Sequence, residues 1–408
     1  MIAKELQDEV HNCIKCGLCM TPCPVYKQLG YEAAAPRGKV QLIKHILEGK
    51  LAPSENFNRI LYTCLLCETC TVNCPSGLQV DRLLKAMRAE MVKKFKLPWQ
   101  KRLLFSMLSG EHLLPLFMQW GGGLGNALMN LVPGGKKVGT IPFAKLPRLN
   151  KKPFREQVPE VVKVAAAKGR VLYFTGCATN YLYEDIGRST LAVLKRLGIE
   201  VILPRGQMCC GLPIFLAGAR DTALGNIRKN LELFNREDVD AVLVDCATCG
   251  SALKKEYVHI LEEMGENAEA AKALSGKVMD LSEYLAKFDL QGMLKPIKGK
   301  VTYHDPCHLV RSQGIKEEPR RLLKQIPGLE FVEMAGADVC CGGGGTFQVD
   351  HPEVAAGITG NKVRAIKDTG ANLVASGCPG CRMQIKGNLG EEAVEVVHPI
   401  QLLARALA

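Results

Sequence analysis

Two stretches of twelve residues, Cys13–Pro24 (CIKCGLCMTPCP) and Cys64–Pro75 (CLLCETCTVNCP), repeat one pattern of cysteines. In both stretches two residues lie between the first and second cysteines and two between the second and third. Three residues then precede the fourth cysteine, and a proline follows it. A loop of this spacing wraps three thiolates around one [4Fe-4S] cube, while the fourth cysteine binds the neighbouring cube. A zinc site is usually built from two separated Cys-x2-Cys pairs, so it fits this spacing poorly. The pattern therefore predicts two iron–sulfur cubes.

The expected ligand sets cross between the two stretches. One cube is assigned to Cys13, Cys16, Cys19 and Cys74, and the other to Cys23, Cys64, Cys67 and Cys70. Pro24 and Pro75 each fit the first turn of a following helix, which would place the preceding thiolate near a positive helix end. Residues 38–49 carry apolar side chains at helical spacing. We therefore expect an α-helical ferredoxin domain over residues 1–95.

Ten further cysteines follow position 176 in two parallel sets. Each set has a lone cysteine, a Cys-Cys-Gly, and a Cys-x-x-Cys, with an offset of about 130 residues between the sets, which indicates an internal duplication. Five thiols exceed the four that a cube takes, and a larger cluster with a bridging thiolate would use five. The sets are Cys177, Cys209, Cys210, Cys246 and Cys249, then Cys307, Cys340, Cys341, Cys378 and Cys381.

Short apolar runs alternate with helical patterns around these ten cysteines, which predicts parallel βαβ units. Several cysteines directly follow a predicted strand, at the edge where open α/β sheets build their sites. Gly211 and Gly342–Gly345 would let the backbone approach a bulky cluster. The fold class is therefore α+β multidomain, with duplicated α/β cysteine-rich domains over 169–290 and 299–408. The predicted strands are 170–174, 201–204, 241–245, 300–303, 330–332 and 372–375, and the helices are 189–197, 220–234 and 353–367.

Residues 96–168 carry no cysteine and seven prolines lie between 98 and 159, so we expect a linker with helices over 99–108 and 113–120. Lysines and arginines flank the apolar residues of the first helix. Such a helix can lie on a membrane surface, or pack on the ferredoxin domain or a partner subunit. Residues 136–170 hold ten Lys/Arg against two Glu. This favours an acidic partner, an anionic lipid surface or a plain solvated linker over nucleic acid, because no aromatic platform is interleaved.

The composition supports a metal-binding globular protein. The 408 residues are 47% hydrophobic and 23% charged, which excludes general disorder, and the net charge is +12. No signal peptide and no apolar run long enough to cross a bilayer is evident. We therefore expect a reducing, cytoplasmic location, where 18 cysteines hold metal more readily than disulfides.

The arrangement resembles the iron–sulfur subunit of glycolate oxidase, within a wider family that includes D-lactate and glycerol-3-phosphate dehydrogenase subunits and heterodisulfide reductases. Besides the cysteines, Pro36–Lys39 and Cys74–Gly77 carry the resemblance. It implies an electron-transfer subunit for glycolate or D-lactate oxidation that serves a partner FAD subunit and delivers electrons to a quinone or another carrier. It also implies noncubane [4Fe-4S] clusters in one or both cysteine-rich domains, and a cytoplasmic or peripheral inner-membrane location.

Two alternatives remain open: a disulfide reductase of the heterodisulfide type, and an assembly protein with structural zinc. A flavin in this chain is not expected, because the glycine-rich run at 121–125 follows no predicted strand and is interpreted as linker. His304 and His308 bracket Cys307 and could donate a proton or tune a cluster, but a structural role is the favoured interpretation. His398 is also assigned a structural role.

Overall fold

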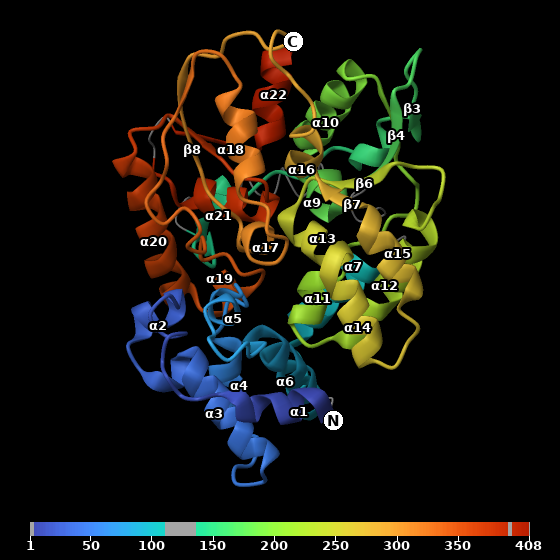
Figure 1. The fold of residues 1–408 in the computed structure, drawn as a ribbon. Helices are drawn as coiled ribbons and strands as arrows, with labels where there is room; N and C mark the ends of the chain where they lie inside the picture. The colour runs from blue at the N-terminus through green and yellow to red at the C-terminus, as the bar shows by residue number, and fades with distance from the viewer. Residues whose placement is uncertain (1–3, 111–135, 391–393, 408) are drawn as a thin grey trace.

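The protein is described here from a computed structural model, which covers residues 4–110, 136–390 and 394–407. Figure 1 shows a helical N-terminal domain at one end, coloured blue, and two α/β lobes that lie side by side above it. The predicted α+β multidomain architecture is confirmed. The predicted helix over 113–120 and the glycine-rich run at 121–125 lie outside the described residues.

The N-terminal domain is built from short helices around a small apolar core. Val40 and Ile43 of one helix pack with Leu61, Leu83 and Leu84 of two others, and all five are buried. Its elements are α1 (Lys4–Glu9), η1 (Val10–Asn12), α2 (Pro24–Leu29), η2 (Glu32–Ala34), α3 (Pro36–Leu47), α4 (Glu55–Tyr62), α5 (Thr69–Val72) and α6 (Val80–Phe95). The predicted helix over 38–49 is α3, which begins two residues earlier because Pro36 occupies its first turn.

The first cysteine-rich lobe contains a five-stranded sheet in the order β3-β5-β4-β6-β7, parallel except for β3. Its strands are β3 (Val161–Val162), β4 (Gly169–Phe174), β5 (Ile199–Ile202), β6 (Ala241–Val244) and β7 (Val278–Asp280). Its helices are α9 (Gly176–Tyr181), α10 (Glu184–Arg196), α11 (Leu212–Leu216), α12 (Arg220–Phe234), α13 (Ala247–Ser251), α14 (Tyr257–Glu263), α15 (Glu269–Lys277) and α16 (Leu281–Leu285), with a π-helical turn at Ala252–Glu256.

The second lobe repeats this plan with a four-stranded parallel sheet in the order β11-β10-β8-β9. Its strands are β8 (Gly299–Tyr303), β9 (Leu329–Phe331), β10 (Leu373–Ala375) and β11 (Glu395–Val397). Its helices are α17 (Cys307–Val310), α18 (Glu317–Lys324), α19 (Phe347–Asp350), α20 (Pro352–Asp368), α21 (Pro379–Asn388) and α22 (Pro399–Leu407). The strand orders β5-β4-β6-β7 and β9-β8-β10-β11 correspond, as a duplication requires.

The two lobes share one continuous apolar interface. Helix α10 of the first lobe packs along α22 of the second, and α13 packs against α17. Val171 and Leu194 of the first lobe belong to the same buried cluster as Val301 and Leu402 of the second. Both lobes therefore fold onto each other, and the cysteine-bearing helices α13 and α17 meet where they join (Figure 1).

The segment between the N-terminal domain and the first lobe contains helix α7 (Trp99–Ser109), close to the predicted 99–108, and the two-stranded ladder of β1 (Lys137–Val138) and β2 (Ile141–Pro142). Single 3-10 turns, η3 (Phe143–Lys145) and η4 (Phe154–Glu156), follow. Strand β3 joins the first sheet, so this sheet reaches back to residue 161, before the predicted lobe boundary at 169.

Several basic residues of the stretch 136–170 form hydrogen bonds and ion pairs with other parts of the chain. The Lys145 ammonium donates to the carbonyl oxygen of Leu389 at 2.5 Å, and the Arg155 guanidinium donates to that of Gln207 at 2.9 Å. Arg170 pairs with Glu200 at 2.6 Å. These three cations hold segments of the lobes in place, so the stretch is not a uniform, free basic surface.

A buried ammonium connects the N-terminal domain to the first lobe. Lys85 on α6 lies 2.8 Å from Asp81 on the same helix and 2.8 Å from Glu256 in the first lobe. Glu68 lies 4.0 Å away, and all four side chains are buried. Burial alone would lower the pKa of Lys85, but Glu256, Asp81 and Glu68 together raise it, so the ammonium stays charged.

Replacing Lys85 with Met should destabilise the protein strongly. The change leaves buried carboxylates without their cation, and breaking a buried ion pair in this way costs about 3–5 kcal/mol of unfolding free energy. Urea unfolding of the metal-loaded protein, followed by circular dichroism, measures the loss. The control is Lys93→Met on the same helix, where the exposed lysine pairs only at the surface with Glu90. Equal unfolding midpoints for the two variants would contradict this role for Lys85.

Candidate iron–sulfur sites

The two cysteine stretches of the N-terminal domain form loops of the same backbone shape. Lys15 and Leu66, each two residues after the first cysteine, have φ of 59° and 50°. Gly17 and Glu68, each four residues after it, have φ of 84° and 60°. Left-handed residues other than glycine are strained, and such strain persists where the surroundings require it. Because two different sequences adopt the same backbone conformation, we infer that each loop curves around a bound group of the same kind.

The fourth cysteine of each stretch leaves its own loop, but by different routes. Cys23 caps the N-terminus of α2, where its sulfur accepts a hydrogen bond from the Tyr26 amide at 3.5 Å and Pro24 occupies the first turn, as predicted. The corresponding prediction for Pro75 is wrong. Pro75 lies in a turn closed by the Gly77 amide bonding the Cys74 carbonyl at 3.1 Å, and the next helix begins only at Val80. Gly77 has φ of 70°, which directs the chain into this turn instead of a helix.

The thiols group across the two stretches. Burial raises the pKa of Cys19, and the neighbouring thiols of Cys13 and Cys74 raise it further. Burial likewise raises the pKa of Cys70, to which Cys64, Cys67 and Cys23 add. The structure thus brings Cys74 to the first loop and Cys23 to the second.

The second group of thiols surrounds an internal cavity. Cys23, Cys64, Cys67 and Cys70 are among the residues that line a space of about 450 Å³, a volume that includes space open to solvent. These four donors are the type and number that a [4Fe-4S] cube takes, so the residues present fit that group. The first group lies nearer the surface: Cys16 is exposed, the one exposed residue among the 18 cysteines, all of which lie in the described ranges.

Two buried cations lie beside the second group, and the sequence analysis assigned a role to neither of them. Lys39 of α3 is 2% exposed and its ammonium donates to the Ala34 carbonyl. Arg88 of α6 is buried, donates to the Cys64 carbonyl oxygen at 2.8 Å and stacks over Tyr62. Burial lowers the pKa of both groups, while nearby thiols oppose the effect. The available signal was a charged residue on the apolar face of a helix, such as Lys39 beside Val40 and Ile43.

All ten cysteines of the duplicated lobes line one cavity of about 1550 Å³, a volume that includes space open to solvent. Its sulfurs approach one another within and between the lobes. Cys177 and Cys209 are 4.0 Å apart, and Thr248 of the first lobe lies 3.9 Å from the sulfur of Cys378 in the second. The two five-cysteine sets therefore form one continuous site at the junction of the lobes.

The strand ends position these sulfurs as predicted. Cys177 and Cys246 follow β4 and β6, and Cys307 and Cys378 follow β8 and β10, at the carboxyl edges of the two parallel sheets. The Cys-Cys pairs lie in loops after β5 and β9 instead, before Gly211 and Gly342.

Gly343, Gly344 and Gly345 line the large cavity, in keeping with the prediction, whereas Gly211 and Gly342 have a different role. Gly211 and Gly342 both have left-handed backbones, with φ of 76° and 87°. A Cβ on Gly342 would lie 2.6 Å from the Thr359 hydroxyl, which belongs to helix α20 and not to a cluster cavity. Close packing of the Cys-Cys loop on the following helix, and not access to a cluster, explains this glycine.

The N-terminal domain meets both lobes beside the cavity, the first through Tyr62 and Arg88 and the second through Cys67. Burial raises the pKa of Cys67 to about 12, and the Cys340 thiol contributes to the rise. Cys340 and Cys67 likewise raise the pKa of Cys307. Leu65, Cys67, Cys340 and Phe347 pack in one buried cluster. The second thiol group of the N-terminal domain therefore adjoins the second lobe's sulfurs.

The three singled-out histidines differ in their surroundings. His398 is buried and its Nδ1 accepts a hydrogen bond from the Ile400 amide at 3.2 Å, in keeping with the expected structural role at the start of α22. His308 lines the large cavity, with Nδ1 3.3 Å from the Thr248 hydroxyl. His304 is fully buried, and one of its ring nitrogens lies near Cys341 and Cys381.

Comparison with protein families matches both parts of the chain. The 4Fe-4S dicluster domain matches residues 9–78, and the cysteine-rich domain (CCG) matches residues 171–254 and 301–386. A solved structure, a hypothetical protein from Helicobacter pylori, aligns with a TM-score of 0.51 at 12% identity over 94% of this chain and 74% of that one. This last likeness concerns the fold alone.

Curated relatives cover nearly the full length. A probable glycolate oxidase iron–sulfur subunit of Bacillus subtilis is 32% identical over 99% of this chain and 96% of its own length. The glycolate oxidase iron–sulfur subunit of Escherichia coli is 28% identical over 99% and 96%. One subunit of the dihydromethanophenazine:CoB–CoM heterodisulfide reductase of Methanosarcina acetivorans is 29% identical over 98% and 94%. With both matched domain types, these full-length likenesses show that the chain belongs to the family of glycolate oxidase iron–sulfur subunits, which are subunits of oxidoreductases.

Proposed function

We propose that this chain is the iron–sulfur electron-transfer subunit of a flavin-dependent 2-hydroxy-acid dehydrogenase, acting on glycolate or D-lactate. A partner subunit with FAD oxidises the hydroxy acid, and this chain conveys the electrons to a quinone or another acceptor. The full-length likeness to two glycolate oxidase subunits supports the assignment. Iron–sulfur clusters supply single-electron transfer, and the residues of this chain determine where the clusters are held.

The order of the thiol groups in space carries the proposal. The first group reaches the surface at Cys16, where Ile14 and Leu18 are also exposed. The second group is internal and its Cys67 adjoins Cys340 of the second lobe. The sulfurs thus form a sequence of sites from the surface to the large cavity, which is the arrangement that stepwise electron transfer needs.

We assign the clusters by this grouping. One cube is held by Cys13, Cys16, Cys19 and Cys74, and the other by Cys23, Cys64, Cys67 and Cys70. The five-cysteine sets of the two lobes each hold a noncubane [4Fe-4S] cluster. Metal analysis of anaerobically purified protein should then find about 16 iron atoms per chain, four for each of four clusters. About eight iron atoms would mean that both lobes are empty.

A disulfide reductase is the second candidate, and the shared cavity favours it. Both five-cysteine sets are complete and face one space that is large enough for a small molecule. In that case a disulfide would take up two electrons and two protons there and leave as two thiols. Reduction of a heterodisulfide by the loaded chain with a low-potential electron donor, without any flavin subunit, would favour this candidate.

Helix α7 offers a contact surface for the partner subunit. Its Trp99, Leu103 and Leu104 are 68%, 56% and 44% exposed, so the part of the chain that the structure describes leaves this apolar side largely uncovered. Exposed Arg102 lies on the same helix. We propose that the partner covers this surface, in a cytoplasmic complex; a peripheral contact with the inner membrane is the alternative. No helix within the described ranges is both long and apolar enough to cross a membrane.

Crossed ligation makes a specific prediction for two single variants. Cys74→Ser should perturb the first cube and spare the second, because the Cys74 thiol lies with Cys13 and Cys19. Cys23→Ser should do the reverse, because Cys23 lies with Cys64 and Cys70. Anaerobic EPR of both variants, with Cys13→Ser and Cys64→Ser as references for each cube, measures the effect. A Cys74→Ser spectrum that matched Cys64→Ser would show local ligation instead.

The loaded chain alone should oxidise no hydroxy acid. Removing hydride from an alcohol carbon needs a cofactor such as a flavin, whereas iron–sulfur clusters move single electrons. Adding the FAD subunit should restore dye or quinone reduction with glycolate or D-lactate. Turnover of either acid by the purified chain without that subunit would refute the proposed division of labour.

A further inference from the structure

His304 is a buried histidine whose two ring nitrogens have unequal surroundings. It follows strand β8, and its side chain is fully buried. Its Nδ1 lies 3.1 Å from the carbonyl oxygen of Ala337. A carbonyl only accepts hydrogen bonds, so Nδ1 carries the proton and donates it. In the neutral ring the other nitrogen, Nε2, therefore presents a lone pair, and it has no hydrogen-bond partner among the described residues.

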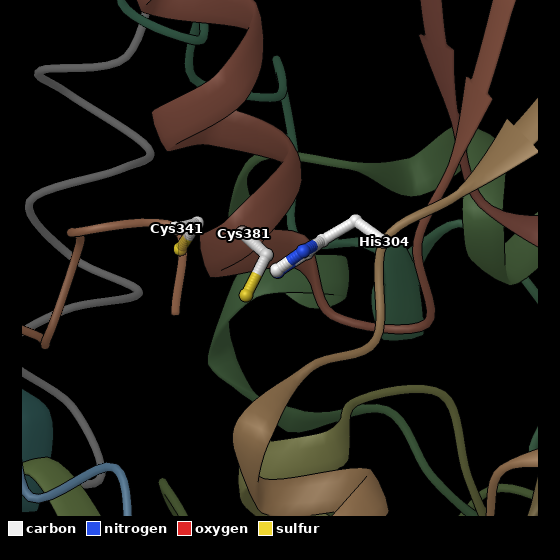
Figure 2. A group of neighbouring side chains, drawn as sticks. All are labelled: His304, Cys341 and Cys381. Atoms are coloured by element: carbon white, nitrogen blue, oxygen red, sulfur yellow. The ribbon is translucent and has the colours of Figure 1, made fainter. Parts of the chain in front are cut away.

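The free side of the ring faces sulfur. Figure 2 shows the His304 ring pointing toward the side chain of Cys381, with Cys341 close by. One ring nitrogen and the two sulfurs all lie within 4.8 Å of one another. Ligands of a tetrahedral metal with bonds of about 2.0–2.3 Å lie roughly 3.5–3.8 Å apart, so a small contraction would complete such a site.

The surroundings hold His304 in the manner of a metal-bound histidine. Ligating histidines commonly donate their second N–H to a backbone carbonyl, which fixes the tautomer and the ring orientation. Here the Ala337 carbonyl that receives Nδ1–H is itself fixed, because the Lys362 ammonium donates to it at 3.1 Å and to the Gly336 carbonyl at 2.7 Å.

The first lobe lacks this nitrogen. Phe174 stands three residues before Cys177, as His304 stands three residues before Cys307. Its ring packs against Phe234 with centroids 5.2 Å apart. Each of the two duplicated sites therefore has five cysteines, and the second lobe adds two histidines, His304 and His308, where the first has Phe174 and Ala178.

We propose that Nε2 of His304 is a ligand to an iron atom of the cluster in the second lobe, beside Cys341 and Cys381, so that the two duplicated sites hold clusters with different ligand sets. The inference rests on the proposed occupancy of the lobes by iron–sulfur clusters.

The test uses the complete, anaerobically loaded chain grown with either natural or 15N-labelled histidine. Pulsed EPR at a potential where the second site is paramagnetic should detect a directly bound nitrogen whose coupling changes with the isotope. This comparison needs no mutation. His304→Phe, which copies the first lobe, should abolish the coupling. The control His308→Phe removes a histidine that also lies beside Cys307 and should retain the coupling.

Three results would overturn the ligation. The first is a protein with full iron content that shows no isotope-sensitive nitrogen coupling. The second is a nitrogen coupling that survives in His304→Phe. The third is a nitrogen coupling that is lost in His308→Phe instead. If the iron of the cluster assigned to the second lobe were missing, the cluster assignment and this ligation would both be wrong. Metal analysis of the unmutated protein separates these cases.

Discussion

Thiol groups that must converge from distant parts of the chain impose the main constraint on this structure. Cys23 and Cys74 cross between loops about 40 to 50 residues apart, and the ten later cysteines meet at the junction of two lobes. Bringing them together requires strained loops at Lys15, Leu66 and Glu68, and continuous packing between the lobes. Much of the fold can be understood as the scaffold that holds these sulfurs, since strand ends and helix starts carry most of them.

The same constraint explains the unusual charges in the interior. Thiolates or clusters are negative, and Lys39 and Arg88 lie buried beside the second thiol group. Lys85 joins the N-terminal domain to the first lobe through buried carboxylates, one of which, Glu68, belongs to a cysteine loop. The ion pairs thus fix the position of the N-terminal domain against the lobes, and with it the approach of Cys67 to Cys340.

The grouping of the cysteines was predictable because their spacing follows from the geometry of the ligand sets. The sheets of the two lobes were predictable because strands β4, β6, β8 and β10 are short, uninterrupted apolar runs. The helix expected from Pro75 begins only at Val80, and the extent of α6 was not expected because its buried charges, Asp81, Lys85 and Arg88, conceal the apolar pattern. The turn at Pro75 depends on the left-handed Gly77, which proline alone does not signal. The short strands β3, β7 and β11 gain their pairing from neighbouring strands, a tertiary effect absent from local sequence. The surroundings of His304 were equally inaccessible, because Ala337 and Cys381 are distant in sequence.

The central claim is that the sulfur groups form an ordered series in which the second group of the N-terminal domain adjoins the second lobe. Anomalous X-ray diffraction at the iron edge, on crystals of the anaerobically loaded chain, tests it most directly. The account predicts iron at both thiol groups of the N-terminal domain and in both lobes, with the iron beside Cys67 closer to the iron of Cys340 and Cys307 than to that of Cys177 and Cys209. Iron absent from the second lobe, or the iron beside Cys67 lying nearest the first lobe, would contradict it.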